Sequence, residues 1–347
     1  MQRRSTLVRC LALGLAAMLP MVPAVAQPVT LRVLTHSSFE LPRELLARFE
    51  QEAGVRLQIA KAGDAGEMVN KLILTKARPI ADVVYGIDNT LLSRARQAGV
   101  LEPYTGPVAG RPSAAALGDG VVPVDHGFVN LNVDKAWFAR SGLALPASLD
   151  DLAQPAYARL VVVQNPATSS PGQAFLMATI AGLGEEAAFD WWGRMRANGL
   201  KVVKGWTEAS YTEFTRNGGT RPIVLSYASS PAAEAFFSQE KLAEAPTANL
   251  FLKGGVFRQV EGVALVRDGQ PAAREAAGRF IEFLRSAPVQ QALQTSMWMY
   301  PAEAGVPLVD VMRRHAAPPA AFDNPDPARM DAQARAWVRR WTKVVMK

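Results

Sequence analysis

Cysteine is almost absent from this sequence of 347 residues: the one thiol is Cys10, in an N-terminal segment that we expect to be removed. A mature chain without cysteine cannot form an intramolecular disulfide, bind a metal through thiolates or use a cysteine nucleophile. Its fold must therefore be stabilised by a hydrophobic core, for which 49% hydrophobic residues supply the material.

Histidine and enzyme motifs are scarce as well. The three histidines, His36, His126 and His315, lie far apart in the sequence. A metal site at the first two is one alternative, but isolated histidines are usually structural, so we expect no metal. The sequence contains no G-x-S-x-G, H-E-x-x-H or P-loop motif. We therefore predict a protein that is not an enzyme.

Long runs of one charge are also missing. The formal charge is +7, and three of the positive charges are Arg3, Arg4 and Arg9 in the N-terminal segment, which leaves about +4 on the remainder. The other basic residues are scattered and form no stripe interleaved with aromatic residues. Nucleic acid is therefore not an expected partner.

Residues 1–26 have the features of a cleavable signal peptide. A basic start is followed by an apolar run from Cys10 to Pro20 and by Ala24-Val25-Ala26, a small-residue cleavage site. The run is too short to span a membrane as a mature helix, so an uncleaved anchor is the weaker alternative. We predict export to the periplasm. The 321 residues that remain are long for one core and predict two lobes.

The mature chain opens with alternating strands and helices. Strands are expected at 29–35, 55–61 and 81–85, and helices at 42–53 and 67–76. This alternation predicts a parallel sheet covered by helices. Ligands of such sheets bind at the carboxyl ends of the strands.

Two extended runs, at 118–132 and 255–266, predict crossovers between the lobes. Between them the alternation repeats, with strands at 160–164, 200–203 and 223–226 and helices from 172, at 185–198, at 207–216 and at 231–239. Helices at 271–285, 288–294 and 327–345 follow. Trp337 and Trp341 share one face of the last helix, which favours core packing over ligand binding. The fold class is therefore α/β, a two-lobed clamshell with residues 27–122 and 264–347 in lobe 1 and 123–263 in lobe 2.

A clamshell binds a small molecule between its lobes. Trp206, Tyr227 and Trp298 lie in turns that we expect at the edges of this cleft. Each ring alone could simply cover the core. Three rings around one cleft favour a box that stacks flat or cationic ligands.

Polar groups also follow predicted strands. Thr168, Ser169, Ser170 and Gly172 stand at a helix start, where hydroxyls and backbone N–H groups could hold an anion such as phosphate; an ordinary N-cap is the alternative. Asp64, Asp88 and Asp125 end strands and could pair with a ligand cation or amine, although aspartates in such turns also serve as local caps.

Six stretches in this order resemble the bacterial periplasmic thiamine-binding proteins. They are ADVVYGIDN at 81–89, VPVDHG at 122–127, NPATSSPG at 165–172, VKGWTEA at 203–209, LSYASSP at 225–231 and WMYP at 298–301. The resemblance implies a clamshell that delivers thiamine or its mono- or diphosphate to the permease and ATPase of an ABC importer. It implies no cofactor, and we expect a monomer.

By motif matching, Asp64, Trp206, Tyr227 and Trp298 take the places of family ligand contacts, and 168–172 that of a phosphate site. His36 and Ala233 stand where the family has tyrosines. A thiamine precursor, another cationic heterocycle or a polyamine therefore remain alternative ligands. A ferric-ion binder is less expected because the sequence has no adjacent tyrosine pair, and a thiaminase-like enzyme would need a cysteine.

Overall fold

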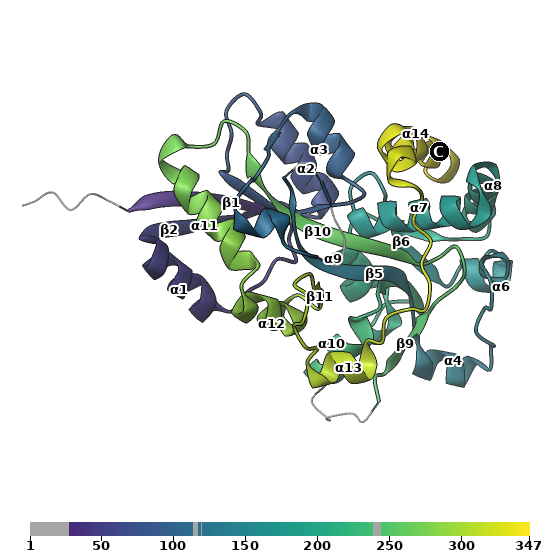
Figure 1. The fold of residues 1–347 in the computed structure, drawn as a ribbon. Coiled ribbons are helices and arrows are strands. Elements are labelled where there is room, and N and C mark those ends of the chain that lie inside the picture. The colour runs from purple at the N-terminus through teal and green to yellow at the C-terminus, as the bar shows by residue number, and fades with distance from the viewer. Residues whose placement is uncertain (1–27, 114–116, 119, 239–243) are drawn as a thin grey trace, which may run out of the picture.

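The structure is a computed structural model that describes residues 28–113, 117–118, 120–238 and 244–347, and Figure 1 shows its fold. The predicted signal peptide at 1–26 lies outside the described residues. Within the described ranges, no helix has both the length and the apolar character needed to cross a membrane.

The first lobe contains the predicted alternation of strands and helices. The parallel strands are β1 (Val29–Thr35), β2 (Val55–Lys61) and β3 (Val83–Asp88), and the helices are α1 (Arg43–Ala53), α2 (Ala65–Leu74) and α3 (Leu92–Ala98). The first two strands have their predicted bounds. Strand β3 begins two residues later than predicted because Asp82 is held outside it, where its carboxylate binds the backbone and guanidinium of Arg32.

The two extended runs form the long strands β5 (Val122–Asp134) and β10 (Phe257–Val266), which pair antiparallel with each other. Through them, hydrogen bonding continues along the order β2-β1-β3-β10-β5-β8-β6-β7 of the described strands. The sheets predicted for the two lobes are therefore joined into one. Pro123, opposite Gly262, lies at an irregularity in this pairing and does not interrupt β5.

The second lobe contains β6 (Val161–Gln164), β7 (Lys201–Val203) and β8 (Ile223–Tyr227), which are parallel, with α7 (Ser170–Leu183), α8 (Glu185–Ala197) and α10 (Ser230–Phe237). The helix predicted at 207–216 is wrong. One α-turn, α9 (Trp206–Glu208), passes into a wide π-turn, η2 (Ala209–Glu213), and a 3-10 turn, η3 (Thr215–Asn217). Between these turns Phe214 adopts an extended backbone and buries its ring, which interrupts the helix.

Shorter elements complete the chain. They are β4 (Leu101–Glu102), η1 (Pro107–Gly110), α4 (Lys135–Ser141), α5 (Leu149–Leu152), α6 (Pro155–Ala158), β9 (Thr247–Leu250), η4 (Pro271–Ala273), β11 (Tyr300–Pro301) and α13 (Asp310–His315). The predicted helices that return to the first lobe are present as α11 (Arg274–Leu284) and α12 (Ala287–Ser296), which lie beside the N-terminal elements in Figure 1.

The last helix, α14 (Pro327–Val345), lies beside α8 in Figure 1. Trp337 and Trp341 are 1% and 0% exposed and belong to the core of the second lobe, so their predicted packing role is confirmed. The ring centroids of Trp341 and Trp192 are 5.5 Å apart. The buried face of α14 therefore packs on the second-lobe core, and α14 also contacts α3 of the first lobe. The predicted lobe boundaries stay a prediction.

Candidate functional site: a cavity between the lobes

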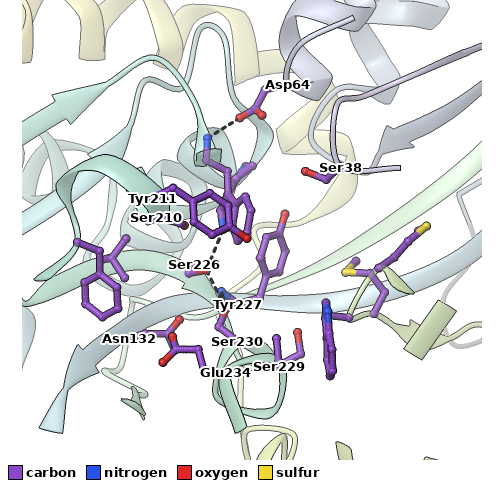
Figure 2. A pocket seen from close by; sticks show the side chains of 18 of the residues that line it. Ser38, Asp64, Asn132, Ser210, Tyr211, Ser226, Tyr227, Ser229, Ser230 and Glu234 are labelled. Carbon is purple, nitrogen blue, oxygen red and sulfur yellow. Dashed lines mark hydrogen bonds between the residues drawn. The ribbon is translucent and has the colours of Figure 1, made fainter. Parts of the chain in front are cut away.

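A cavity of about 330 Å³ lies between the two lobes. Its wall comes from the loops after β1 and β2, the start of α7, the turns from α9 to η3, β8 with α10, the middle of β10, and the segment between α12 and β11. Figure 2 shows the side chains of 18 of the residues that line it. Two of the strand ends that the alternation pattern had indicated, those after β1 and β2, thus line the cavity, whereas the end of β3 does not.

The structure brings together six of the eleven predicted site residues. His36, Asp64, Ser170, Trp206, Tyr227 and Trp298 line the cavity, whereas Asp88, Asp125, Thr168, Ser169 and Gly172 do not. Whether any of these side chains contacts a ligand stays a prediction.

Trp206 and Tyr227 are fixed by hydrogen bonds to the second lobe and the crossover. The indole Nε1 of Trp206 donates to Ser226 Oγ at 2.8 Å, and its ring meets Tyr211 edge-on at 5.6 Å between centroids. The hydroxyl of Tyr227 donates to Gln259 at 2.7 Å. Both rings are therefore held in place before any ligand enters.

Trp298 lies in a strained backbone conformation. Its φ is +59°, a left-handed value that is uncommon for a residue with a side chain and that tends to occur at functional sites. Its ring meets those of Phe236 and Phe237 at 5.3 and 5.6 Å between centroids. Both phenylalanines are exposed, and Phe237 also lines the cavity. Because Phe237 follows Ala233 by one helical turn, it supplies a ring on the face of α10 where position 233 has none.

Asp64 bridges the two lobes. It is the N-cap residue of α2, but its side chain makes no capping bond there; its carboxylate instead accepts the backbone N–H of Trp206, the first residue of α9, at 3.0 Å. The alternative that Asp64 caps its own helix is therefore wrong. Nearby, Lys204 Nζ lies 2.7 Å from Glu67 Oε1. Both contacts join the start of α2 to the segment at 204–206.

The predicted phosphate segment contributes little to the cavity wall. Thr168 donates its hydroxyl to Lys204 O at 2.6 Å, and the side chain of Ser169 makes no capping bond. Gly172 allows α7 to approach β6, because a Cβ there would lie 2.3 Å from Gln164 O. Only Ser170 of this group reaches the cavity, and its hydroxyl accepts a bond from Gln259 at 2.9 Å.

Asp88 is completely buried behind the cavity wall. Its Oδ1 accepts bonds from the backbone N–H groups of Thr90 and Leu91 and from the Thr90 hydroxyl, and Gln259 Nε2 donates to its other oxygen. Asp88 therefore fixes the turn into α3, which is the local role left open by the sequence.

Asp125 belongs to a buried cluster with Tyr85, Glu261 and His36. The Tyr85 hydroxyl lies 2.5 Å from Asp125 Oδ2 and 3.1 Å from Glu261 Oε2, and His36 Nε2 lies 3.4 Å from the same Glu261 oxygen. Burial and the Glu261 charge raise the pKa of Asp125 well above its usual range. Although burial opposes its ionisation, His36 lowers the pKa of Glu261.

The sequence analysis missed several lining residues, among them Glu261, Ser210, Tyr211, Glu234 and Phe237. Glu234 faces the cavity from α10, at the end far from Asp64 in Figure 2, and burial raises its pKa to about 7. Glu261 carried one available signal: it is a carboxylate within an otherwise buried strand. Among the described residues, no group of three or more His, Cys, Asp or Glu side chains is placed to hold a metal ion.

A two-lobed α/β fold with two crossovers and a ring-lined cavity between the lobes defines a solute-binding protein of the periplasmic type. Residues 78–332 match the family of bacterial extracellular solute-binding proteins, and the chain belongs to this family.

Relatives with assigned roles are similar along nearly the whole chain. The thiamine-binding periplasmic protein of Salmonella typhimurium is 31% identical over 331 residues, which are 94% of this chain and 96% of that protein. The protein of the same name from Escherichia coli is 31% identical over 347 residues, covering 98% and 100%.

Solved structures agree with the fold. A periplasmic thiamin binding protein superposes with a TM-score of 0.81 at 29% identity and covers 92% of this chain and 97% of that one. The ferric binding protein from Campylobacter jejuni has a TM-score of 0.73 at 17% identity, covering 90% and 99%, and shows the fold alone. All of these relatives are binding proteins.

Proposed function

We propose that this protein binds thiamine or one of its phosphate esters in the cavity between its lobes and delivers it to the permease of an ABC importer. The observation that carries the proposal is the set of three rings, Trp206, Tyr227 and Trp298, around one cavity that also contains carboxylates. The relatives named as thiamine-binding proteins support the same ligand.

The chemistry of the cavity suits the parts of thiamine. Ring faces stack a flat aminopyrimidine and attract a permanently cationic thiazolium. Carboxylates suit the exocyclic amine and the cation. The start of the 14-residue helix α7, with Ser170, suits a phosphate on the hydroxyethyl arm. A cavity of about 330 Å³ lies within the size range of sites for small ligands.

The proposal includes the cellular setting. The signal peptide at 1–26 would be removed on export, and the mature chain would act in the periplasm as a monomer. It would present its closed form to the permease, whose ATPase drives uptake. No cofactor is required for this role, because binding and hinge closure involve no bond making.

Thermal unfolding of the purified mature chain tests the proposal. Thiamine or its monophosphate should raise Tm, since a ligand at one hundred times its Kd stabilises the folded state by about 2.7 kcal/mol. Spermidine at the same concentration should give no comparable shift. Absence of a shift with every thiamine form at millimolar concentration would contradict the proposal.

Two ring variants test the site itself. Trp206→Ala and Trp298→Ala should each weaken thiamine binding about 30-fold, because a desolvated cation–π contact is worth about 2 kcal/mol. Trp137→Ala is the matched control, since Trp137 lies on α4 outside the cavity. Loss of folding in both cavity variants, with affinity unchanged in the folded fraction, would indicate that these rings serve the core.

A further inference from the structure

Of the acidic residues predicted to meet the ligand, each already has a partner within the protein. Asp64 accepts the Trp206 N–H, Asp88 fixes the turn into α3, and Asp125 is bound by Tyr85. Glu261 was not predicted, yet it lines the cavity. It lies on the crossover strand β10, directly opposite Asp125 on β5, and is 5% exposed.

Glu261 carries the negative charge of the buried cluster. Two adjacent buried carboxyl groups do not both ionise at low cost, so they share one proton. Burial and the charge of Glu261 raise the pKa of Asp125, whereas His36 holds the pKa of Glu261 down against the effect of burial. The shared proton therefore resides on Asp125, and the charge resides on Glu261 beside the cavity.

His36 is the group that places a positive charge beside Glu261 among the described residues; Arg216, which also lines the cavity, is near Glu234 instead. Its Nδ1 accepts the backbone N–H of Ser38 at 3.2 Å, so the proton of the neutral ring is on Nε2, which lies 3.4 Å from Glu261 Oε2. A second proton would have to enter at Nδ1 and break the bond from Ser38. Burial lowers the pKa of His36, but Glu261, together with Asp64 and Asp88, raises it above its usual value.

The other titratable groups that act on His36 are acidic. Asp64 in the loop after β2 and Asp88 at the end of β3 favour its charged form, and Tyr85 on β3 packs against it at 5.6 Å between ring centroids. The nearby cation at the rim, Lys204, is paired with Glu67. A cation that enters the cavity next to Glu261 therefore competes with the second proton of His36 for the same negative charge.

We propose that Glu261 is the counter-charge for a permanently cationic heterocyclic ligand, and that binding of this cation releases a proton from His36. The inference rests on the proposed function, because it names the charge of the ligand that the same cavity takes. Because binding and loss of the proton are linked, the affinity for the ligand depends on pH. The affinity is highest above the pKa of His36 and falls by up to about tenfold per pH unit as the pH drops through that pKa.

Titration calorimetry with thiamine on the full mature chain tests the inference. Near neutral pH, in two buffers of different ionisation enthalpy, the apparent heats should differ by the release of up to one proton per thiamine bound. His36→Gln should still bind thiamine but release no proton, and its affinity should be flat between pH 5.5 and 8. Glu261→Gln should bind at least tenfold more weakly.

The outcomes separate the two proposals. No binding of thiamine by the wild type overturns both. Binding without proton release, or with a pH-independent affinity, overturns this inference alone. Proton release that persists in His36→Gln and disappears in Glu234→Gln also overturns it, because the pKa of the cavity carboxyl Glu234 is raised to about 7. If Glu261→Gln does not fold, the His36→Gln result decides.

Discussion

Gly66 lies where the two lobes touch. A substitution at this position can therefore change the affinity for ligand without lowering the stability of the ligand-free protein. It is in the first turn of α2, and a Cβ added to it would lie 2.6 Å from Thr168 O and 2.7 Å from the carbonyl carbon of the same residue. Both atoms are backbone on the opposite side of the rim and cannot rotate away. Real Cβ contacts are not shorter than about 3.0 Å, so Gly66→Ala must separate the lobes by at least 0.4 Å.

The expected effects on stability and on affinity have opposite signs. Overpacking of a tight contact costs about 1–3 kcal/mol. The ligand-free protein avoids this cost by opening, and alanine favours a helix over glycine by about 1 kcal/mol, so the free energy of unfolding without ligand should be unchanged or higher. The free energy of the closed form rises relative to the open form by the same ~1–3 kcal/mol. Its population therefore falls, and thiamine binding weakens about 5- to 150-fold.

Titration calorimetry and urea unfolding of the ligand-free protein measure the two effects. Gly193→Ala is the matched control, because Gly193 is also a helical glycine but the nearest atom to its added Cβ, Val344 Cγ1, is 3.8 Å away. The control should bind thiamine like the wild type. A Gly66→Ala protein with wild-type affinity would refute the idea that the contact between Gly66 and Thr168 closes the rim around the ligand.

Three further predictions concern residues with other roles. Trp337→Ala should lower the free energy of unfolding, measured by urea titration, by about 3–5 kcal/mol, because the ring is buried in the second-lobe core. The folded fraction should keep its thiamine affinity, because the ring lies away from the cavity. A loss of affinity at unchanged stability would contradict this. Asp64→Asn should weaken thiamine binding about fivefold without affecting unfolding, because the amide oxygen still accepts the Trp206 N–H but the charge is lost. Equal affinities by calorimetry would show that the charge of Asp64 does not contribute to binding. In the folded protein Asp125 keeps its proton at pH values where the unfolded chain has lost it. The wild type should therefore lose stability relative to Asp125→Asn as the pH rises above about 4. If urea unfolding from about pH 4 to 8 gives parallel stability curves for the two proteins, the raised pKa has no such effect.

The alternation of strands and helices could be predicted because it depends on local hydrophobic periodicity, and β1 and β2 were predicted to the residue. The bond from Trp206 to Asp64 could not, because it joins segments 142 positions apart. Glu261 was missed because a single carboxylate in an apolar strand gives no periodic signal, and its partners come from three other strands or their ends. The face of a helix can be read from its sequence but its packing partners cannot, so the contacts of α14 with α8, α7 and α3 could not be predicted.

The position of α14 has a consequence for the order in which the protein folds during synthesis. Trp337 and Trp341 complete a core whose other members, among them Phe175, Trp191 and Trp192, are made about 150 residues earlier. Until residues 327–345 have left the ribosome, the surfaces of α7 and α8 that these two rings cover remain exposed to water. The second lobe therefore finishes folding late, and a nascent chain with an incomplete core stays available to any machinery that handles unfolded polypeptides.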